Sequence, residues 1–544
     1  MTEELPDSPV PTGRRSRALM AAGLFVGLLT LGGWWVGRDL VPAAAPPRRA
    51  NAGSRLFDQV LVAVASRYVD SLDASTLYDK AVTGMLHELK DPYTTFLGED
   101  RLRRLNEQMS GTYTGVGLQM DVRDGWPTVI EPVPGGPSWK AGILAGDRLM
   151  KVAGDLTKGW TRDEASRALR GPPGSKVDFV IERGDQLLPI TVQREAVHVR
   201  AVTRVTMLPN MVGYVDVNVF NQTTAAELQQ AVDSLVRQGA RGLLMDLRGN
   251  PGGLLEQGVG VAELFLDPGQ SIVQLRARPG QAAQTIGDTA AQRWPTLPLA
   301  VLIDRGSASA SEIVAGALQD HDRAVVVGMT SYGKGNAQNV YPLVSGGALR
   351  LTTARWFTPA GRSISKLRPR DPDDDNADAD GVALPNDTLK PRFRTDGGRT
   401  VLGGGGITPD VQVGDSITPL PVQNLARAMG RRLADYRDAL AQEAASVRTR
   451  IKGPNEQVSR EMLDEVFRQL VARKVAPDRA IFDSASPWVA RSLGYEMTRV
   501  AFGPDAEFLR RAQDDAVIQR SSRIVQAAKV PKQVFIGASG VPAR

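Results

Sequence analysis

The spacing of hydrophobic positions changes along the chain. Between residues 54 and 109 apolar residues recur about every four positions, as at Leu56, Val60 and Val64, which predicts helices broken at Pro92. From residue 110 to 198 short apolar runs are separated by Gly and Pro, with one helical stretch, "TRDEASRALRG", before the last two. This second pattern predicts a small, partly open β barrel.

From residue 211 onward, predicted strands and helices alternate. The apolar runs "VGYVDVNV", "GLLMDLRGN", "LAVLIDRGS" and "RAVVVG" predict strands, and amphipathic stretches between them predict helices. Such βαβ alternation is typical of a parallel sheet covered by helices, in which ligands bind at the carboxyl ends of the strands. The polar segments "DLRGNPGG" and "GSASAS" follow two of these strands, so we expect them at that edge.

The rest of the chain predicts a hairpin, an acidic insertion and a second helical region. "NVYPLVSGGALRLTTARWF" predicts two strands joined by an SGG turn. Residues 368–400 hold an acidic stretch of low hydrophobicity, which favours a solvated segment. Residues 416–544 return to a helical period with two apolar stripes, which we expect to be packing faces. The stripes are Leu425, Met429, Leu433, Tyr436 and Leu440, and Leu463, Val466, Phe467, Leu470 and Val471.

The N-terminal region contains a charge-free apolar run over residues 18–37, about long enough to cross ~30 Å of hydrocarbon. Three arginines precede it and two tryptophans lie near its far end, which predicts a cytoplasmic N-terminus and an exported remainder. A cleaved signal peptide, with Ala43–Ala45 as the cleavage site, is the alternative. We expect an uncleaved anchor, because the run is longer than a usual signal-peptide core.

Composition narrows the classes of function. The 544 residues contain no cysteine, which excludes disulfides, cysteine-type zinc sites and thiol catalysis. The 42% hydrophobic content is ample for packed cores. The formal net charge of +6 is mild, and no basic patch with interleaved aromatic residues occurs, so nucleic acid is not an expected partner.

The stretch "GSASASEIVAGALQD" begins at Gly306 and places serines at alternate positions where a strand is expected to turn into a helix. Ser309 and Glu312 fit a capping box, with serine at the N-cap and glutamate at N3. The same geometry suits a nucleophile, because a helix N-terminus offers free amides and a positive dipole to a developing oxyanion. Both interpretations, cap and nucleophile, follow from this pattern.

A serine nucleophile needs a base. The three histidines, His87, His198 and His321, lie in contexts typical of surface or packing residues, and no G-x-S-x-G motif occurs. Lys334 is flanked by glycines between apolar runs, and burial would lower its pKa toward neutrality. If the following strand is extended, Gln338 shares its face and could hold the neutral amine. A tight turn explains the glycine-flanked lysine equally well.

Taken together, these motifs resemble those of the carboxy-terminal processing peptidases, also called tail-specific proteases. The resemblance rests on "GSASASEIVAGALQD" and "SYGKGNAQ", supported by "DLRGNPGGLLEQGV", "LRLTTARWFTPAGRSI" and "GGGGITPDV", and covers about residues 54–415. "TGVGL" and "AGILAGDRLMKVAG" resemble the PDZ domain that these enzymes insert. The resemblance implies a multidomain α/β plus α protein, with a crotonase/ClpP-like βα peptidase core.

Two features depart from the family pattern. The acidic insertion is longer than is typical, and residues 416–544 have no counterpart in short members, so these extra helices are expected either to dimerise or to recruit an adaptor. The predicted order is a cytoplasmic tail (1–17), a transmembrane anchor (18–37), a linker (38–53), an N-terminal helical region (54–109), a PDZ domain (110–198), a Ser-Lys peptidase domain (199–415) with the insertion (368–400), and a C-terminal helical region (416–544).

The resemblance also implies a role for each matched residue of the peptidase domain. Ser309 matches the nucleophile, Lys334 the general base and Gln338 the glutamine that accompanies it in some bacterial members. The amides of Ala310 and of a glycine in "NPGG" match the oxyanion donors. Of the two glycines there, Gly253 is preferred over its neighbour.

In the PDZ domain the resemblance implies capture of a substrate C-terminus. A glycine-containing loop would present backbone amides to the carboxylate while the peptide adds as a strand. Arg170 matches an arginine that couples peptide binding to assembly of the active site in some relatives. The loop residues are Gly115, Val116, Gly117 and Leu118.

The expected function is therefore a serine endopeptidase anchored in a bacterial inner membrane and facing the periplasm, which recognises protein C-terminal tails and needs no metal or organic cofactor. The alternative is a catalytically resting or inactive PDZ scaffold at the membrane that needs an adaptor. A third interpretation, the S-x-x-K pattern at Ser363–Lys366, lacks the accompanying S-D-N and K-T-G motifs.

Overall fold

The computed structural model describes residues 50–344, 346–366, 390–414, 418–475 and 478–539. The predicted cytoplasmic tail and anchor, most of the linker and most of the acidic insertion lie outside these residues. Within them, no helix combines the length and hydropathy that a membrane crossing requires. The chain forms two compact units, one up to residue 88 and one from residue 89 onward.

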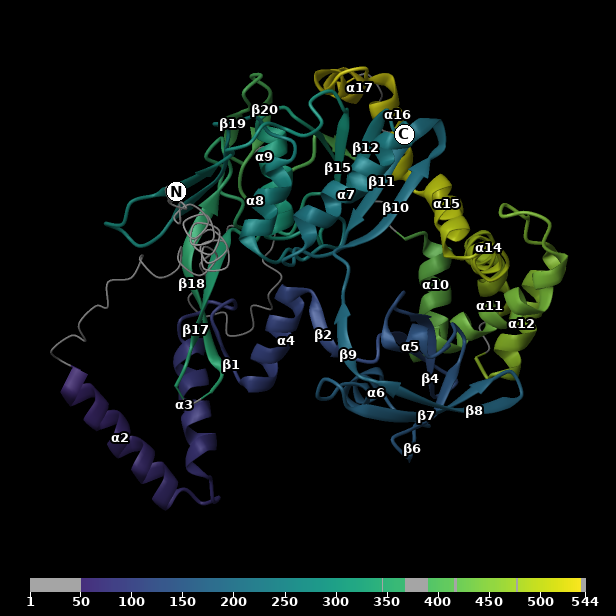
Figure 1. The fold of residues 1–544 in the computed structure, drawn as a ribbon, viewed down its shortest axis with the longest axis horizontal. Helices are drawn as coiled ribbons and strands as arrows, with labels where there is room; N and C mark the ends of the chain where they lie inside the picture. Colours follow the sequence, from purple (N-terminus) through teal and green to yellow (C-terminus); the bar gives the residue numbers. More distant parts are fainter. Residues whose placement is uncertain (1–49, 345, 367–389, 415–417, 476–477, 540–544) are drawn as a thin grey trace, which may run out of the picture. The chain divides into compact units, whose positions relative to one another are not determined.

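The first unit holds two of the predicted helices (Figure 1), α2 (Ala50–Arg67) and α3 (Ala74–His87). Asp73 caps α3 by accepting a hydrogen bond from the Thr76 amide at 3.0 Å. On α2, Leu56 is 63% exposed, so this helix presents apolar residues that its own unit does not bury. The helical pattern is confirmed up to His87, and the second unit begins at the break predicted near Pro92.

The second unit contains a largely parallel sheet, as predicted. Within the described residues this sheet has six strands, in the order β10-β11-β12-β15-β16-β21. All neighbours are parallel except β10 and β11, and helices α7, α8 and α9 lie between successive strands from β11 to β16 along the chain. The strands are β10 (Val202–Leu208), β11 (Val212–Val217), β12 (Gly242–Asp246), β15 (Leu299–Ile303), β16 (Val325–Gly328) and β21 (Val411–Gln412).

Alternate residues of this sheet enter two different cores, because side chains alternate along a strand. Leu243 and Met245 pack with α7, α8 and α9 on one face, and Leu244 packs with α16 and α17 on the other. Every residue of α9 is buried, so the turn that precedes it starts from a fixed element. The helices are α7 (Thr224–Arg237), α8 (Leu255–Glu263), α9 (Ala310–Asp320), α16 (Ala516–Ala527) and α17 (Val534–Ser539).

A second, antiparallel sheet carries the predicted hairpin. Its order is β1-β18-β13-β14, with β17 pairing β18, and the pairing shifts between Ala337 and Gln338, where Thr353 of β18 is the extra residue. Helix α4 follows β1. The elements are β1 (Thr95–Leu97), α4 (Glu99–Ser110), β13 (Ser271–Arg276), β14 (Gln284–Gly287), β17 (Asn336–Pro342) and β18 (Ala348–Phe357), with a separate pair β19 (Arg392–Arg394) and β20 (Thr400–Leu402).

The predicted barrel-like region is an antiparallel module with its own core, which includes Val129, Leu149 and Phe179. Its sheet runs β3-β4-β5-β7-β8, with β6 beside β5, and α6 packs against β3. Thr161 and Glu164 form a capping box at the start of α6. The elements are β2 (Thr112–Gly115), β3 (Leu118–Arg123), β4 (Trp126–Pro132), α5 (Pro137–Lys140), β5 (Arg148–Val152), β6 (Asp155–Leu156), α6 (Arg162–Leu169), β7 (Lys176–Arg183), β8 (Gln186–Gln193) and β9 (Glu195–His198), where β2 pairs β9.

The C-terminal region is helical, as predicted, and most of it surrounds a separate core. Four residues of the first predicted stripe are buried, but Leu433 is 48% exposed. The reason is that Gly430, at φ 53°, ends α10, so the stripe does not lie on one continuous helix. The helices are α10 (Leu420–Met429), α11 (Leu433–Val447), α12 (Arg460–Ala472), α13 (Arg479–Ser484), α14 (Ser486–Phe502) and α15 (Pro504–Asp514).

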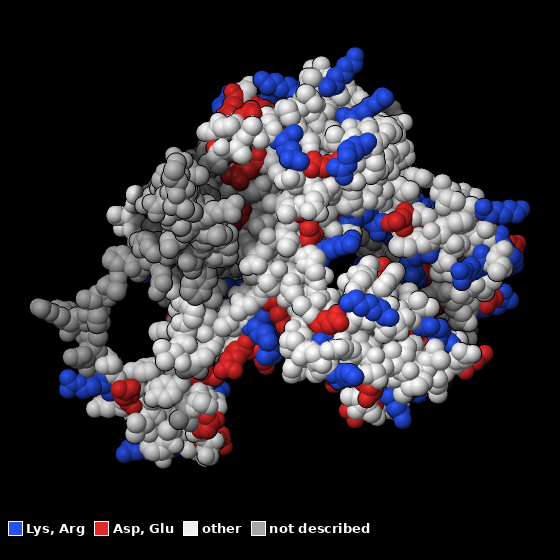
Figure 2. All heavy atoms as spheres, viewed as in Figure 1, with Lys and Arg blue, Asp and Glu red and all other residues white. Residues whose placement is uncertain are grey.

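Figure 2 shows charged side chains of both signs dispersed over one face of the molecule.

Candidate active site

Ser309 lies at the turn between β15 and α9, where the sequence predicted it. Its backbone has φ 56° and ψ −115°, a conformation that costs a residue with a side chain about 1–3 kcal/mol and persists only when neighbours enforce it. Asn250, from the "DLRGNPGG" segment, provides that support: its carbonyl accepts from the Ala308 amide and from the Ser311 hydroxyl, both at 3.0 Å. The strained serine is therefore held from two sides.

Glu312 connects the Ser309 turn to the Lys334 loop. Its side chain is fully buried, and Oε2 accepts from the backbone N–H of Ser309 at 2.8 Å and of Lys334 at 2.9 Å. The other oxygen accepts from the Ser331 hydroxyl at 2.6 Å and the Gly333 amide at 2.7 Å. Burial raises the pKa of Glu312, and these hydrogen bonds act in the opposite direction. One carboxylate thus fixes the backbones of both candidate catalytic residues.

Lys334 lies in the loop before β17 with its amine against an aromatic ring. Nζ is 5.2 Å from the ring centroid of Tyr93, and the Lys334 carbonyl accepts from the Trp356 indole at 3.1 Å. No hydrogen bond joins Lys334 Nζ to the Ser309 hydroxyl in the part of the chain that the structure describes. Catalytic hydrogen bonds are often long in the absence of substrate and shorten when it binds. The backbones of Ser309 and Lys334 are therefore held in position, while the Lys334 amine does not yet form a hydrogen bond with the Ser309 hydroxyl.

The surroundings of Lys334 favour its neutral form. Burial is the main cause that lowers the pKa of the amine, and the nearby guanidinium of Arg350 lowers it further. The carboxylates of Glu312 and Asp91 oppose this shift. The net direction is downward, as a lysine that acts as a base requires.

Replacing Arg350 by glutamine is expected to move the pH dependence of cleavage. Cleavage should rise with pH as Lys334 loses its proton, and the Arg350 cation disfavours the protonated amine. Without that cation the pKa of Lys334 is higher, so the acid limb of the kcat/KM profile should move to higher pH. Arg355→Gln, at an exposed arginine of the same strand, is the control. A profile that does not move in Arg350→Gln would contradict this role.

Gln338 lies on β17, and the structure does not pair it with Lys334. Its amide donates to the Asn336 carbonyl at 3.1 Å, and no hydrogen bond reaches the amine within the described residues. The expectation of a shared face assumed an extended chain from Gly335 onward, whereas β17 begins at Asn336 and Lys334 lies in the loop before it. Its role beside Lys334 stays a prediction.

Two backbone amides next to Ser309 lack acceptors among the described residues, those of Ala310 and Gly253. Ala310 is the first residue of α9, whose N–H has no partner inside the helix. The Gly252 amide instead donates to Asn250 Oδ1 at 2.8 Å, which favours Gly253 as the second oxyanion donor. Gly252 supports the site in another way: at φ +92°, a Cβ there would lie 2.8 Å from Ser309 Cβ, so only glycine fits.

The predicted carboxylate loop joins β2 to β3, with Gly115 at the end of one strand and Leu118 at the start of the other. The carbonyl of Val116 accepts from the Ser138 amide at 2.9 Å, and Gly117 adopts φ +73°. These contacts hold the loop at the start of the edge strand, where a peptide carboxylate would bind. Its binding role remains a prediction.

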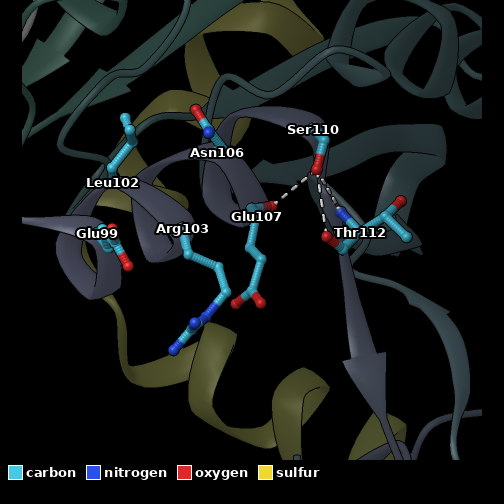
Figure 3. Close-up of a pocket in the computed structure, with 7 residues that line it drawn as sticks. All are labelled: Glu99, Leu102, Arg103, Asn106, Glu107, Ser110 and Thr112. Carbon is cyan, nitrogen blue, oxygen red and sulfur yellow. Dashed lines mark hydrogen bonds between the residues drawn. The ribbon is translucent and has the colours of Figure 1, made fainter. Parts of the chain in front are cut away.

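Arg170 connects the barrel-like module to α4. Its guanidinium pairs with Glu107 and lies 5.2 Å from the ring centroid of Tyr113. Figure 3 shows Glu107 extending from α4 beside Arg103. Both residues line a shallow hollow of about 440 Å³. None of the predicted catalytic residues lines that hollow. The structure thus gives Arg170 a partner outside the module, while its regulatory role stays a prediction.

Comparison with known proteins places this site in a family. The model for peptidase family S41 matches residues 211–373, a PDZ domain model matches 128–183, and a model for the N-terminal domain of the activating protease CtpB matches 47–101. The carboxy-terminal processing protease CtpA of Bacillus subtilis is 35% identical over 323 residues, which cover 59% of this chain and 69% of that protein. This chain belongs to peptidase family S41.

A further relative agrees with that membership, and a solved structure is also similar in sequence. A carboxy-terminal-processing protease of Bartonella bacilliformis is 36% identical over 57% of this chain and 72% of its own length. The solved photosystem II D1 C-terminal processing protease is 30% identical, with 70% of this chain and 98% of that chain covered at a TM-score of 0.36. The S41 protein described here is thus a carboxy-terminal processing serine protease with a PDZ domain, the barrel-like module.

Two of the three histidines of this S41 protease have side-chain partners other than Ser309. His198 lies 2.7 Å from Glu227, and His321, which follows α9, lies 2.7 Å from Asp396. Asp320, at the end of α9, forms a buried ion pair with Arg362 at 2.5 Å. That pair supports a structural role for the aspartate.

Sequence reasoning missed several residues that shape the site. Glu312 was expected only as a capping partner, although its position three residues after Ser309 was a usable signal. Tyr93 and Arg350 come from distant segments, and nothing in the local sequence connects them to Lys334. Arg248 was also missed: it joins the carboxylate of Asp246 at 2.6 Å to that of Asp515, the N-cap of α16, at 2.9 Å.

Proposed function

We propose that this S41 protease is a single-pass protein of a bacterial inner membrane that cleaves exported proteins whose C-terminal tails bind its PDZ domain. The charge-free run over residues 18–37, with arginines before it, supports an anchor with the bulk of the chain in the periplasm. In spheroplasts, added protease should digest the chain beyond residue 38. Protection of that part would contradict the proposed orientation.

The proposed chemistry uses Ser309, Lys334 and two backbone amides. Ser309 Oγ attacks the peptide carbonyl carbon while its proton passes to the neutral amine of Lys334. The amides of Ala310 and Gly253 stabilise the negative oxygen of the tetrahedral intermediate. The C–N bond then breaks as Lys334 returns the proton to the leaving amine, and water hydrolyses the acyl-enzyme by the same route.

The observation that supports this function best is the double role of Glu312. It ties the backbones of Ser309 and Lys334 to the same buried carboxylate, so nucleophile and base belong to one preorganised unit. A scaffold that only bound peptides would not need a strained serine whose backbone is tied, through Glu312, to that of a lysine whose pKa is lowered by burial.

The test is cleavage of an unstructured protein with an apolar C-terminal tail by the full chain. Cleavage is expected from the wild type and from Ser363→Ala, which removes the serine of the S-x-x-K pattern, and should be absent from Ser309→Ala. Blocking the tail carboxylate should slow cleavage, because PDZ capture requires it. If the wild type cleaves nothing under any condition, a resting scaffold that needs an adaptor becomes the better description.

A further inference from the structure

Strand β3 of the PDZ domain has a free edge. Within the described residues it pairs with β4 alone, and it starts directly after the loop that ends at Leu118. A peptide that adds to this edge with its carboxylate at the loop must run toward Arg123, at the other end of the strand. At ~3.3 Å per residue, the six residues of β3 match about six residues of a bound tail.

The far end of β3 is not open to solvent on all sides, because the C-terminal helical region contacts it. Arg437 of α11 lies 3.5 Å from Asp121, and Arg473, which follows α12, lies 2.9 Å from Asp124. A tail that follows β3 beyond its first residues therefore reaches these helices.

A cavity of about 310 Å³ lies at this junction. It is lined by residues 121–123 of β3 and by residues of α11, α14 and α15, which include Tyr436, Trp488 and Tyr495. Tyr436 and Trp488 are stacked with centroids 5.6 Å apart. Three arginines balance three carboxylates in the lining, so its formal charge is zero, and the three aromatic residues give it surface that suits an aromatic side chain.

We propose that this cavity is an upstream subsite for the substrate tail, which takes an aromatic side chain about six residues before the C-terminus. The proposal rests on PDZ capture of the tail as part of the proposed function. A bound tail would continue into the cavity, because the edge strand that receives the tail also lines the cavity. Residues 416–544 then take part in selecting substrates, in addition to any dimerisation or adaptor binding.

Peptide binding to the full chain carrying Ser309→Ala tests this subsite. Three labelled peptides share the same apolar C-terminal residues: one of about four residues, one of about ten with phenylalanine about six from the end, and one of about ten with serine there. The phenylalanine peptide is expected to bind about tenfold more tightly than the other two, as measured by fluorescence anisotropy. Amidation of the C-terminus should weaken all three.

A substitution that fills the cavity should abolish the tenfold tighter binding of the phenylalanine peptide and leave binding of the short peptide unchanged. Ala441→Phe places a ring in the cavity lining of α11, and Ala445→Phe places one at an exposed position a turn later on the same helix. Ala441→Phe should bind all three peptides like the short one, and Ala445→Phe should keep the tenfold gain.

Three results would overturn the proposal: equal affinity for the two long peptides, no gain over the short peptide, or a gain that survives in a folded Ala441→Phe. If Ala441→Phe does not fold, the comparison of phenylalanine and serine peptides in the parent protein still decides. If amidation has no effect on any peptide, PDZ capture itself fails, which distinguishes that failure from the absence of the subsite.

Discussion

Replacing Lys334 by methionine is expected to lower kcat/KM for tail cleavage by about 10⁴-fold while the protein stays folded. Methionine keeps an unbranched stem against the ring of Tyr93 but has no amine to accept the Ser309 proton. The hydroxyl would then have to lose its proton to water. Single-turnover cleavage of a tailed substrate measures the loss, and the melting temperature reports on the fold.

Lys366 offers a matched control for this substitution. Its amine lies 4.9 Å from the ring centroid of Tyr332, so it makes an aromatic contact like that of Lys334, and its backbone N–H is not among the donors to Glu312 within the described residues. Lys366→Met should cleave at the wild-type rate. Comparable rates for the wild type and Lys334→Met would show that another group removes the proton.

Replacing Glu312 by glutamine is expected to lower both activity and stability. The glutamine amide has only one acceptor oxygen. Its NH₂ group would therefore face two of the four donors from which the carboxylate now accepts hydrogen bonds. Leaving two buried donors unsatisfied costs ~2–6 kcal/mol in unfolding free energy. Because the same bonds align Ser309 with Lys334, kcat/KM should fall by about 10²-fold or more.

Glu256 provides the comparison for that prediction. It lies in the first turn of α8 and is exposed, so Glu256→Gln removes a helix-start carboxylate without any buried partner. Chemical denaturation and cleavage rates of Glu312→Gln and Glu256→Gln show whether the loss is specific to the buried carboxylate. If Glu312→Gln retains the stability and rate of Glu256→Gln, the carboxylate does not hold the site together.

The hydrophobic periodicity of the sequence was sufficient to predict the strands and helices near the site. Strands buried on both faces are continuous apolar runs, which is why β12 and β15 could be predicted from "GLLMD" and "LAVLI". The position of Ser309 at the start of α9 followed from the same pattern. The PDZ module was predicted from its short alternating runs and its glycine turns.

What the sequence could not predict depends on local irregularity and on distant contacts. Lys334 lies in the loop before β17 and so does not share a strand face with Gln338, because the strand begins only at Asn336 and its first residue has no clear signature in a period-two pattern. The break at Gly430 exposes Leu433 in a stripe that otherwise follows the helical period. The ring of Tyr93 meets Lys334 through tertiary packing, about which neither local segment carries information.

The central claim is that the neutral amine of Lys334 activates Ser309, and covalent labelling tests it without a protein substrate. A fluorophosphonate reacts by forming a bond from Ser309 Oγ to phosphorus with loss of fluoride, so its rate reports on removal of the hydroxyl proton. We expect labelling of the wild type at Ser309 to rise with pH to a plateau, and labelling of Lys334→Met to be slower by orders of magnitude. Equal labelling rates and identical pH profiles for the two proteins would contradict the account.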